Sequence, residues 1–278
     1  MPELPEVETI CQALKPLLEG KSFLKIQANR PDLRYPLPVN LETVLNHKLI
    51  SLISRRAKYL LLDFSYGLTL IWHLGMSGRV IIENLNAHSL NSGPHDHVVF
   101  IISNNYKITF RDPRRFGFLL LYPTNQLKSL HPFNTLGPEP LGDIPLGVSV
   151  FHAALKRRTI SIKNALLDQR IIAGLGNIYA SEALWQARLS PRRGANTLRL
   201  LETKILLIEI QNVLRRAISA GGSTLRDYAQ PNGDTGYFQY SFNVYNREHL
   251  LCNHCNFTPI TRIVQSGRAT YYCDKCQQ

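Results

Sequence analysis

Residues 131–147 read HPFNTLGPEPLGDIPLG and separate two unlike halves of the chain. Proline lacks a backbone N–H and glycine is conformationally permissive. The four prolines and three glycines in this stretch therefore disfavour both helix and strand. Residues 131–150 are expected to form a linker, and the sequence patterns on its two sides predict a different class of structure for each half.

Before the linker, the pattern is that of short strands. Residues 22–122 contain YLLLDF, LTLIW, HVVFII, YKITF and FGFLLLY, separated by polar turns such as SYG and SNNY. Such spacing is typical of an antiparallel sandwich or barrel. An amphipathic helix should precede the strands, because the apolar residues from Pro5 to Leu18 share one helical face and Gly20 follows. Cys11 lies on that face, so we expect a packed thiol.

After the linker, the pattern becomes helical. The stretches ALKRRTISIKNALLDQR (154–170), NIYASEALWQARL (177–189) and LRLLETKILLIEIQNVLRRAISAGG (198–222) predict three or four helices. Residues 223–246 are polar, with glycine and aromatic residues, which predicts a loop. The tail is expected to form short strands around its cysteines.

The tail carries the pattern of a metal site. Cys252-Asn-His-Cys255 is followed, after 17 residues, by Cys273-Asp-Lys-Cys276. Two CxxC pairs at this separation predict one tetrahedral zinc with four thiolate ligands and no open position, hence a structural zinc. A pair of redox dithiols is the alternative, and His254 is a further candidate ligand. The metal would stabilise a β-hairpin with Arg268 near its tip, as a phosphate contact or as a solvated charge.

The expected fold class is α+β with two domains. The expected boundaries are residues 1–130 for an N-terminal helix and antiparallel β-sandwich, 131–150 for the linker, 151–246 for the helical domain and 247–278 for a four-cysteine zinc finger.

Charge and hydropathy limit the binding partners and the cellular compartment that the sequence favours. The formal net charge is +12; residues 151–278 carry 17 Lys and Arg against 8 Asp and Glu, and residues 1–150 carry 15 against 12. Such a field favours polyanions, nucleic acid first, although an inert basic surface has the same composition. No apolar run approaches the roughly 18 residues of a membrane span. No signal-peptide pattern is present, so we expect a cytoplasmic protein.

The N-terminus, MPELPEVETI, is acidic and offers an unusual amine. A small second residue favours removal of Met1, which would leave Pro2 with a free secondary amine. An α-amino group titrates near about 7.7–8, so roughly a tenth of it is neutral and nucleophilic at pH 7. Glu3 and Glu6 would lie on the first helical turn and shuttle protons. The alternative is structural, because acidic residues and Pro5 are ordinary in a first turn.

The N-terminal motif and the C-terminal cysteine segment, considered together, indicate a protein family. The chain contains PELPEVE at 2–8, RRAKYL at 55–60, HLGMSG at 73–78, DPRRFG at 112–117, LGPEPL at 136–141, GLGNIYASEAL at 174–184, GGSTLRDY at 221–228 and RATYYC at 268–273. In this order, and over essentially the whole chain, these motifs resemble the formamidopyrimidine-DNA glycosylase family. Leu4, where the endonuclease VIII branch usually has Gly, favours the branch that acts on oxidised purines, as does DPRRFG.

The resemblance implies a bifunctional base-excision repair enzyme of the bacterial cytosol. Its partner would be double-stranded DNA containing oxidised bases or abasic sites. The resemblance further implies a helix-two-turn-helix in the helical domain, one structural Zn²⁺, no membrane association, no obligate protein partner and a monomer. Pro2 would attack C1′ and displace the base, and β- then δ-elimination would cleave the strand. Glu3 would act as acid/base, Glu6 would support the site, and Lys58 is assigned as both catalytic and DNA-binding.

The resemblance also assigns DNA contacts. Met76, Arg114 and Phe116 would fill the space left by the flipped base, with core packing as the alternative for Met76 and Phe116. Lys163 matches a family lysine near the scissile region, with a solvated helix charge as the alternative. The other assigned contacts are Lys58, His73, Asn177, Tyr245 and Arg268, the last also as proton donor for elimination, and helix N-termini within 157–190. Thr224 and Tyr240 are assigned to a loop, 223–246, that would close over the lesion.

Two departures from the family pattern replace glycine. Asn256 follows the second cysteine, where the family often has Gly; Asn tolerates a left-handed turn. VYNRE stands where the family usually has Tyr-Gly-Arg, which puts the assignment of Tyr245 in doubt. Residues 84–94 are expected to be a loop of free length.

A non-catalytic damaged-DNA-binding protein on the same scaffold is the alternative function. Both proteins would bind DNA in a salt-sensitive way, but only the enzyme would form a covalent intermediate. Pro2, Glu3 and Lys58 are all present, which favours the enzyme.

Overall fold

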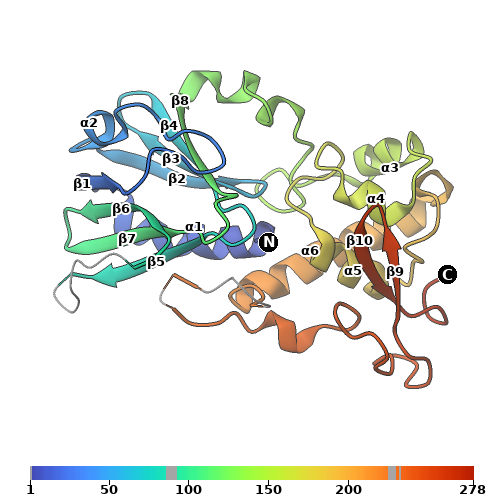
Figure 1. Cartoon of the computed structure of the whole chain (residues 1–278). Helices are drawn as coiled ribbons and strands as arrows, with labels where there is room; N and C mark the ends of the chain where they lie inside the picture. The colour runs from blue at the N-terminus through green and yellow to red at the C-terminus, as the bar shows by residue number, and fades with distance from the viewer. Residues whose placement is uncertain (1, 86–92, 225–229, 232) are drawn as a thin grey trace. The chain divides into compact units, whose positions relative to one another are not determined.

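The computed structural model describes residues 2–85, 93–224, 230–231 and 233–278 (Figure 1). The chain forms two compact units. Unit 1 comprises Met1–Asn134 and Ala220–Gln239, and unit 2 comprises Thr135–Ser219 and Tyr240–Gln278. The chain therefore passes between the units three times, and a segment that follows most of unit 2 completes unit 1. The expected domain boundaries at 130, 150 and 246 stay predictions.

Unit 1 is an antiparallel β-sandwich preceded by a helix, which confirms the expected class. Two four-stranded sheets make the sandwich, with orders β2-β3-β4-β8 and β1-β6-β7-β5. The strands are β1 (Phe23–Ala28), β2 (Ile50–Arg56), β3 (Tyr59–Phe64), β4 (Leu68–His73), β5 (Arg79–Asn84), β6 (Asp96–Ile102), β7 (Tyr106–Arg111) and β8 (Phe118–Pro123). The five predicted runs correspond to β3, β4, β6, β7 and β8. Short helices lie at α2 (Leu41–Leu45), η1 (Thr124–Ser129) and η2 (Phe133–Thr135).

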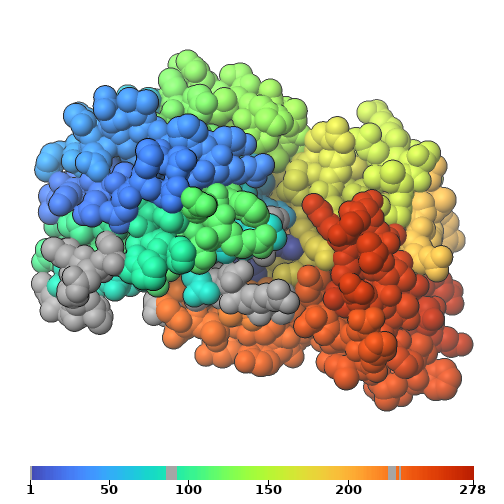
Figure 2. Space-filling view, viewed as in Figure 1, coloured from blue at the N-terminus to red at the C-terminus, as the bar shows by residue number. Residues whose placement is uncertain are grey.

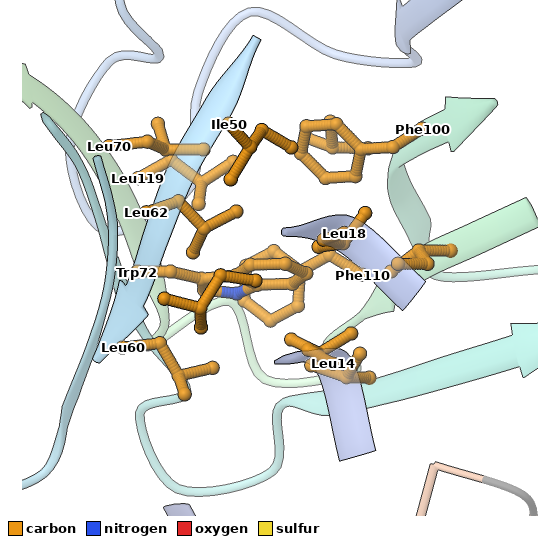
Figure 3. Packing of buried hydrophobic residues seen from close by; sticks show 14 of the residues in the cluster. Leu14, Leu18, Ile50, Leu60, Leu62, Leu70, Trp72, Phe100, Phe110 and Leu119 are labelled. Atoms are coloured by element: carbon orange, nitrogen blue, oxygen red, sulfur yellow. The ribbon is translucent and has the colours of Figure 1, made fainter. Parts of the chain in front are cut away.

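The core of unit 1 brings side chains of both sheets together with those of α1 (Leu4–Leu18) (Figure 3). Trp72 and Phe100 meet with ring centroids 5.5 Å apart, and Leu14 and Leu18 of α1 are fully buried. The predicted apolar face of the helix is therefore confirmed. Cys11 lies on it, and burial raises the pKa of its thiol to about 12, so the thiol is packed and unreactive.

Unit 2 is helical and ends in a hairpin, as expected. Its elements are α3 (Val148–Lys156), α4 (Ile162–Leu167), α5 (Asn177–Gln186), η3 (Ala195–Thr197), α6 (Leu200–Ser219), β9 (Thr261–Gln265) and β10 (Arg268–Tyr272); η4 (Phe238–Ser241) begins in unit 1 and ends in unit 2. Helix α5 packs on α6 and on β10. Within the described residues, no helix has the length and hydropathy needed to cross a membrane.

Residues 154–170 contain the end of one helix and the whole of a second, in line with the three or four helices expected. Helix α3 ends at Lys156, and α4 begins only at Ile162. The Ser161 side chain accepts the N–H of Asn164 at 3.4 Å and caps α4. A serine that satisfies a free N–H in this way favours a helix start over a helix interior.

Candidate active site and zinc centre

Two buried carboxylates mark the start of α1. Glu3 and Glu6 are 3% and 1% exposed, and Pro2 is buried as well. The two glutamates form a capping box, in which Glu6 Oε2 accepts the N–H of Glu3 at 2.8 Å. The structural alternative is thus correct in that both residues cap the helix. Glu3 also follows Pro2 directly in the chain, and the Glu6 carboxylate binds the backbone of Glu3.

The second oxygen of Glu6 holds a distant segment of unit 1. Glu6 Oε1 accepts the N–H and the hydroxyl of Ser223 at 2.9 and 3.0 Å. The same carboxylate therefore joins the residue that follows Pro2 to the beginning of the segment 220–239. The sequence did not indicate Ser223 as a partner, because 217 positions separate it from Glu6.

The segment 220–239 is held by its own hydrogen bonds. Phe238 donates its N–H to the Gly222 carbonyl at 3.1 Å, and Gly236 donates its N–H to Thr224 Oγ1 at 2.8 Å. The segment is also tied to a sheet edge, because Ile82 of β5 donates its N–H to the Pro231 carbonyl at 2.8 Å. Residues 225–228 of GGSTLRDY lie outside the described residues, as do Met1 and most of the expected loop at 84–94.

Lys58 lies in the turn between β2 and β3 and is 8% exposed. Arg55 ties this turn to α1. Its Nε donates to Glu8 Oε2 at 2.7 Å, and its Nη1 donates to the Ala57 carbonyl at 2.9 Å. The position of Lys58 is therefore fixed through the helix that begins with the capping glutamates.

His73 ends β4, next to the Lys58 turn in the sheet. Its ring stacks on Phe118 with centroids 4.9 Å apart, and its Nδ1 accepts the N–H of Gly75 at 3.1 Å. Burial, followed by the nearby charges of Lys58 and Arg34, lowers the pKa of His73 to about 4. The ring is consequently neutral at pH 7, with Nε2–H available as a donor.

Met76, Arg114 and Phe116 lie on two loops of unit 1, residues 74–78 and 112–117. Met76 and Phe116 are 38% and 42% exposed, so the core-packing alternative is wrong for both. The Arg114 guanidinium lies 4.9 Å from the Phe116 ring centroid. The loops touch so closely that a Cβ on Gly75 would lie 2.3 Å from the Phe116 carbonyl carbon, and Gly75 has a φ of +65°. Glycine is required there on both counts.

The four tail cysteines form the zinc centre. Their Sγ atoms all lie within 4.8 Å of one another, and the pairs Cys252–Cys276 and Cys255–Cys273 are each separated by 3.9 Å. A tetrahedral zinc with Zn–S bonds of about 2.3 Å requires sulfur atoms about 3.8 Å apart, far longer than a disulfide. The four sulfurs fit one structural zinc, and no further candidate ligand joins the group among the described residues.

The immediate surroundings of Cys252 support the zinc centre. Trp185 Nε1–H and the backbone N–H of His254 each donate to Cys252 Sγ at 3.4 Å. Such donors stabilise thiolate charge at a metal site. Asn256 has a φ of +51°, so it adopts the left-handed turn expected after the second cysteine.

The hairpin of β9 and β10 belongs to the segment coloured red in Figure 2. It carries Arg268 next to its turn, and the residue is exposed. Lys163 is fully buried, so the solvated-charge alternative is wrong. Its Nζ donates to the Ala269 carbonyl at 2.9 Å and to Thr270 Oγ1 at 2.6 Å. Asn177 Nδ2 donates to the same Ala269 carbonyl at 2.9 Å. Two residues assigned to DNA thus hold the backbone that follows Arg268.

Tyr245 is held by a carboxylate that the sequence did not reveal. Glu182 of α5 is 1% exposed and accepts the backbone N–H groups of Asn243, Val244 and Tyr245 at 2.9, 3.0 and 2.8 Å. Burial raises the pKa of Glu182, and these donors partly offset the shift. Asn246 has a φ of +58°, the conformation that glycine would adopt there.

Comparisons with known proteins agree with this geometry. The model of the formamidopyrimidine-DNA glycosylase N-terminal domain matches residues 1–119, and that of the formamidopyrimidine-DNA glycosylase H2TH domain matches residues 136–229. Proteins named formamidopyrimidine-DNA glycosylase from Azorhizobium caulinodans and Dinoroseobacter shibae are each 47% identical to the chain, over the full length of both partners.

Solved structures extend the match to three dimensions. The MutM (Fpg) protein of Thermus thermophilus is 38% identical, with a TM-score of 0.87 over 99% of this chain and 98% of that one. The Lactococcus lactis Fpg, in complex with DNA containing an abasic site, is 33% identical, with a TM-score of 0.90 over both full chains. The fold and the zinc centre are those of a helix-two-turn-helix DNA glycosylase. The chain belongs to the formamidopyrimidine-DNA glycosylase family, the bifunctional glycosylases with lyase activity at abasic sites.

Proposed function

We propose that the chain excises oxidised purines, 8-oxoguanine and formamidopyrimidines, from duplex DNA through a Schiff base on Pro2. It would then cleave the strand by β- and δ-elimination. The observation that carries the proposal is the burial of Glu3 and Glu6 at the start of α1, next to Pro2. Related structures support the substrate class, since they include an Lactococcus lactis Fpg mutant with Fapy-dG-containing DNA and MutM with carbocyclic 8-oxo-G-containing DNA.

The chemistry begins at the Pro2 nitrogen after removal of Met1. The neutral amine donates its lone pair to C1′, and the bond from C1′ to the base breaks as the base leaves with the electron pair and takes up a proton. The Pro2 nitrogen passes its own proton to the Glu3 carboxylate, and Glu3 delivers that proton to O4′. The C1′–O4′ bond then breaks, the sugar ring opens and an iminium is left on Pro2. Loss of a C2′ proton then expels the 3′ phosphate, loss of a C4′ proton expels the 5′ phosphate, and water releases Pro2.

Glu6 acts in this scheme by positioning rather than by proton transfer. Its two oxygens accept from Glu3 and from Ser223, so it fixes the start of the proposed lesion loop relative to the capping glutamate. Thr224 would hold that loop through Gly236, and the exposed Tyr240 would contact the lesion. A single carboxylate would thus make the geometry of the loop and of the helix start depend on each other.

The DNA contacts follow the same assignment. Lys58 and Arg268 would bind phosphates by charge, with Arg268 also supplying the proton for elimination. His73 would donate a neutral hydrogen bond, because its lowered pKa keeps it uncharged at pH 7. Asn177 and Tyr245 complete the assigned contacts, whereas the buried Lys163 would act indirectly, by holding the backbone that follows Arg268. Met76, Arg114 and Phe116 would enter the duplex where the base leaves, as a wedge of exposed apolar side chains and one guanidinium.

The structural zinc contributes to DNA binding by holding the hairpin. When bound to Cys252, Cys255, Cys273 and Cys276 it supplies four metal–sulfur bonds to a segment too small to build its own core. We also propose that the protein is a monomer of the bacterial cytosol, without an obligate protein partner.

Borohydride trapping tests the mechanism. The zinc-loaded protein is incubated with an 8-oxoguanine:cytosine duplex and borohydride, and the cross-linked peptide is identified by mass spectrometry. We expect one adduct, on the Pro2 nitrogen, together with strand cleavage. The Glu3→Gln variant should bind the duplex and cleave it more slowly.

The other outcomes separate the alternatives. An adduct on a lysine would keep the lyase but overturn Pro2 as the nucleophile. Tight binding without an adduct or strand cleavage, on this duplex and on formamidopyrimidine duplexes, would identify a non-catalytic damage-binding protein.

A further inference from the structure

Asp112 is a fully buried carboxylate to which none of the roles above is assigned. Its Oδ1 accepts the hydroxyl of Ser77 at 2.5 Å, and its Oδ2 accepts the backbone N–H of Gly117 at 2.7 Å. Among the described residues it has no ion-pair partner. A buried carboxylate without a cation is costly unless well-aligned donors satisfy it, so these two bonds are strong constraints on the loops that supply them.

The bonds of Asp112 join the two loops that carry the proposed wedge. Ser77 follows Met76 in the first loop, and Gly117 follows Phe116 in the second. Ser77 Oγ also accepts the backbone N–H of Arg114 at 3.1 Å. Each wedge residue therefore either makes, or is next in sequence to a residue that makes, a hydrogen bond to this serine–aspartate pair.

The backbone of Asp112 is fixed independently of its side chain. Its carbonyl lies 2.8 Å from Nε2 of the buried His97 of β6, and its N–H donates to the His95 carbonyl at 3.1 Å. The carboxylate is thus attached to the sandwich and holds the buried Ser77 and Gly117, while the neighbouring Met76, Arg114 and Phe116 are exposed. A rigid base beneath an exposed tip is the arrangement expected of a preformed contact.

We infer that Asp112 and Ser77 are positioning residues that hold Met76, Arg114 and Phe116 in one arrangement before DNA binds. The inference rests on the proposed function of these three as the wedge. A preformed wedge does not have to be ordered on binding, which lowers the entropic cost of opening the duplex. The pair should therefore matter for base extrusion from a duplex and little for the chemistry on a sugar that is already accessible.

Two substrates distinguish these steps. Excision of 8-oxoguanine from a duplex requires the wedge, whereas borohydride trapping on a single-stranded abasic oligonucleotide requires the amine but no extrusion. The first variant, Asp112→Asn, places an amide N–H₂ against either the Ser77 hydroxyl or the Gly117 N–H, so one hydrogen bond is lost. The second, Ser77→Ala, removes the hydroxyl. Asp63→Asn is the matched control, because Asp63 also accepts a hydroxyl at 2.5 Å, from Thr69, within the β3–β4 pair and away from both loops.

We expect Asp112→Asn and Ser77→Ala to slow single-turnover duplex excision by about tenfold or more while single-stranded trapping changes by less than about twofold. Discrimination between cytosine and adenine opposite the lesion should fall as well. The Arg114 guanidinium would donate hydrogen bonds to the cytosine left unpaired, and the variants remove the constraint on its backbone. Asp63→Asn should leave the ratio of the two rates unchanged. General destabilisation would lower both rates together and leave discrimination intact.

Two outcomes would overturn the inference: a parallel loss on both substrates, or wild-type duplex excision in both variants. If Asp112→Asn does not fold, Ser77→Ala alone decides. A wild-type protein that forms no adduct on either substrate would instead overturn the proposed function, and the inference with it.

Discussion

Trp185 and Trp72 differ at the scale of a single atom. Trp185 Nε1–H donates to a zinc ligand, whereas the buried Nε1 of Trp72 has no hydrogen-bond partner among the described residues. Trp185→Phe should therefore weaken zinc binding by about tenfold, the lower end of the range for a donor behind a metal ligand. Competition with a chromophoric chelator measures the affinity.

Trp72→Phe is the matched control for this substitution. It removes an indole from the core of unit 1 and lowers stability, but it breaks no hydrogen bond to a metal ligand. Zinc affinity should stay at the wild-type value. Equal losses of zinc affinity in the two variants would contradict a role for the N–H of Trp185.

His73 gives unit 1 a defined pH dependence. Its folded-state pKa of about 4 lies below the unfolded value of about 6.5. Below pH 6.5 the unfolded chain takes up a proton that folded His73 does not, so the free energy of unfolding should fall between pH 6.5 and 4. The slope from this residue is at most about 1.4 kcal/mol per pH unit. Urea unfolding of the wild-type protein and of His73→Gln at several pH values measures the difference.

The neutral ring itself can be observed directly. An NMR titration should place the midpoint of the His73 imidazole near 4, and the variant should lack the corresponding slope in unfolding free energy. A midpoint near 6.5 would show that Lys58, Arg34 and burial do not act on the ring as the geometry indicates.

At the scale of elements, Lys163 connects α4 to β10. Its buried ammonium holds Ala269 and Thr270, so Lys163→Met should loosen the hairpin and weaken DNA binding. A lysine that contacts phosphate directly contributes about 0.9 to the slope of log K against log salt. A lysine that only positions the hairpin contributes nothing to that slope. We therefore expect weaker binding with an unchanged salt slope.

Lys156→Met is the control, because Lys156 ends α3, and its Nζ bonds the Asn196 carbonyl near the surface. DNA affinity should change little. A drop of about one unit in the salt slope of Lys163→Met would show direct phosphate contact instead.

The sequence predicted the strands well where hydrophobic runs were dense, and less well elsewhere. The runs that became β3, β4, β6, β7 and β8 are short, apolar and bounded by turns. In strands β1, β2 and β5, apolar residues are mixed with polar and charged ones, as in FLKIQA and ISLISRR. The sequence pattern therefore did not predict these three strands individually. The break between α3 and α4 occurs because Ser161 caps α4 instead of lying inside a longer helix. The local sequence pattern is compatible with either position of the serine.

The candidate site divides in the same way. Motif and spacing predicted the four cysteines, because CxxC is a local signal, and the structure brings all four together. The assignments of the N-terminal residues and of the proposed wedge residues stay predictions. Partners far apart in sequence were missed, since nothing local links Glu6 to Ser223, Asp112 to Ser77 or Glu182 to Tyr245. The burial of Lys163 was missed for the same reason, because its acceptors lie more than 100 residues away.

At the scale of the whole molecule, zinc is expected to stabilise one unit and not the other. Unit 1 has its own large core, whereas the small cluster around Val244, Cys252, Ile260 and Cys273 depends on the metal-bound segment. Chelation of the zinc should therefore unfold the β9–β10 hairpin and abolish tight DNA binding, while the β-sandwich of unit 1 stays folded. Hydrogen exchange would detect this as lost protection confined to unit 2, and loss of protection in β3 and β4 would contradict it.

The division of unit 1 along the chain affects how the protein is made. On a ribosome the amine, its glutamates and both sheets emerge first, but Ser223 and Pro231, which Glu6 and Ile82 bind, emerge only after α6. A nascent chain can form the sandwich but cannot close the contact behind its own N-terminus. The hydrogen bonds of Glu6 at the start of α1 are therefore completed late in synthesis, after helices α3 to α6 of unit 2 have been translated.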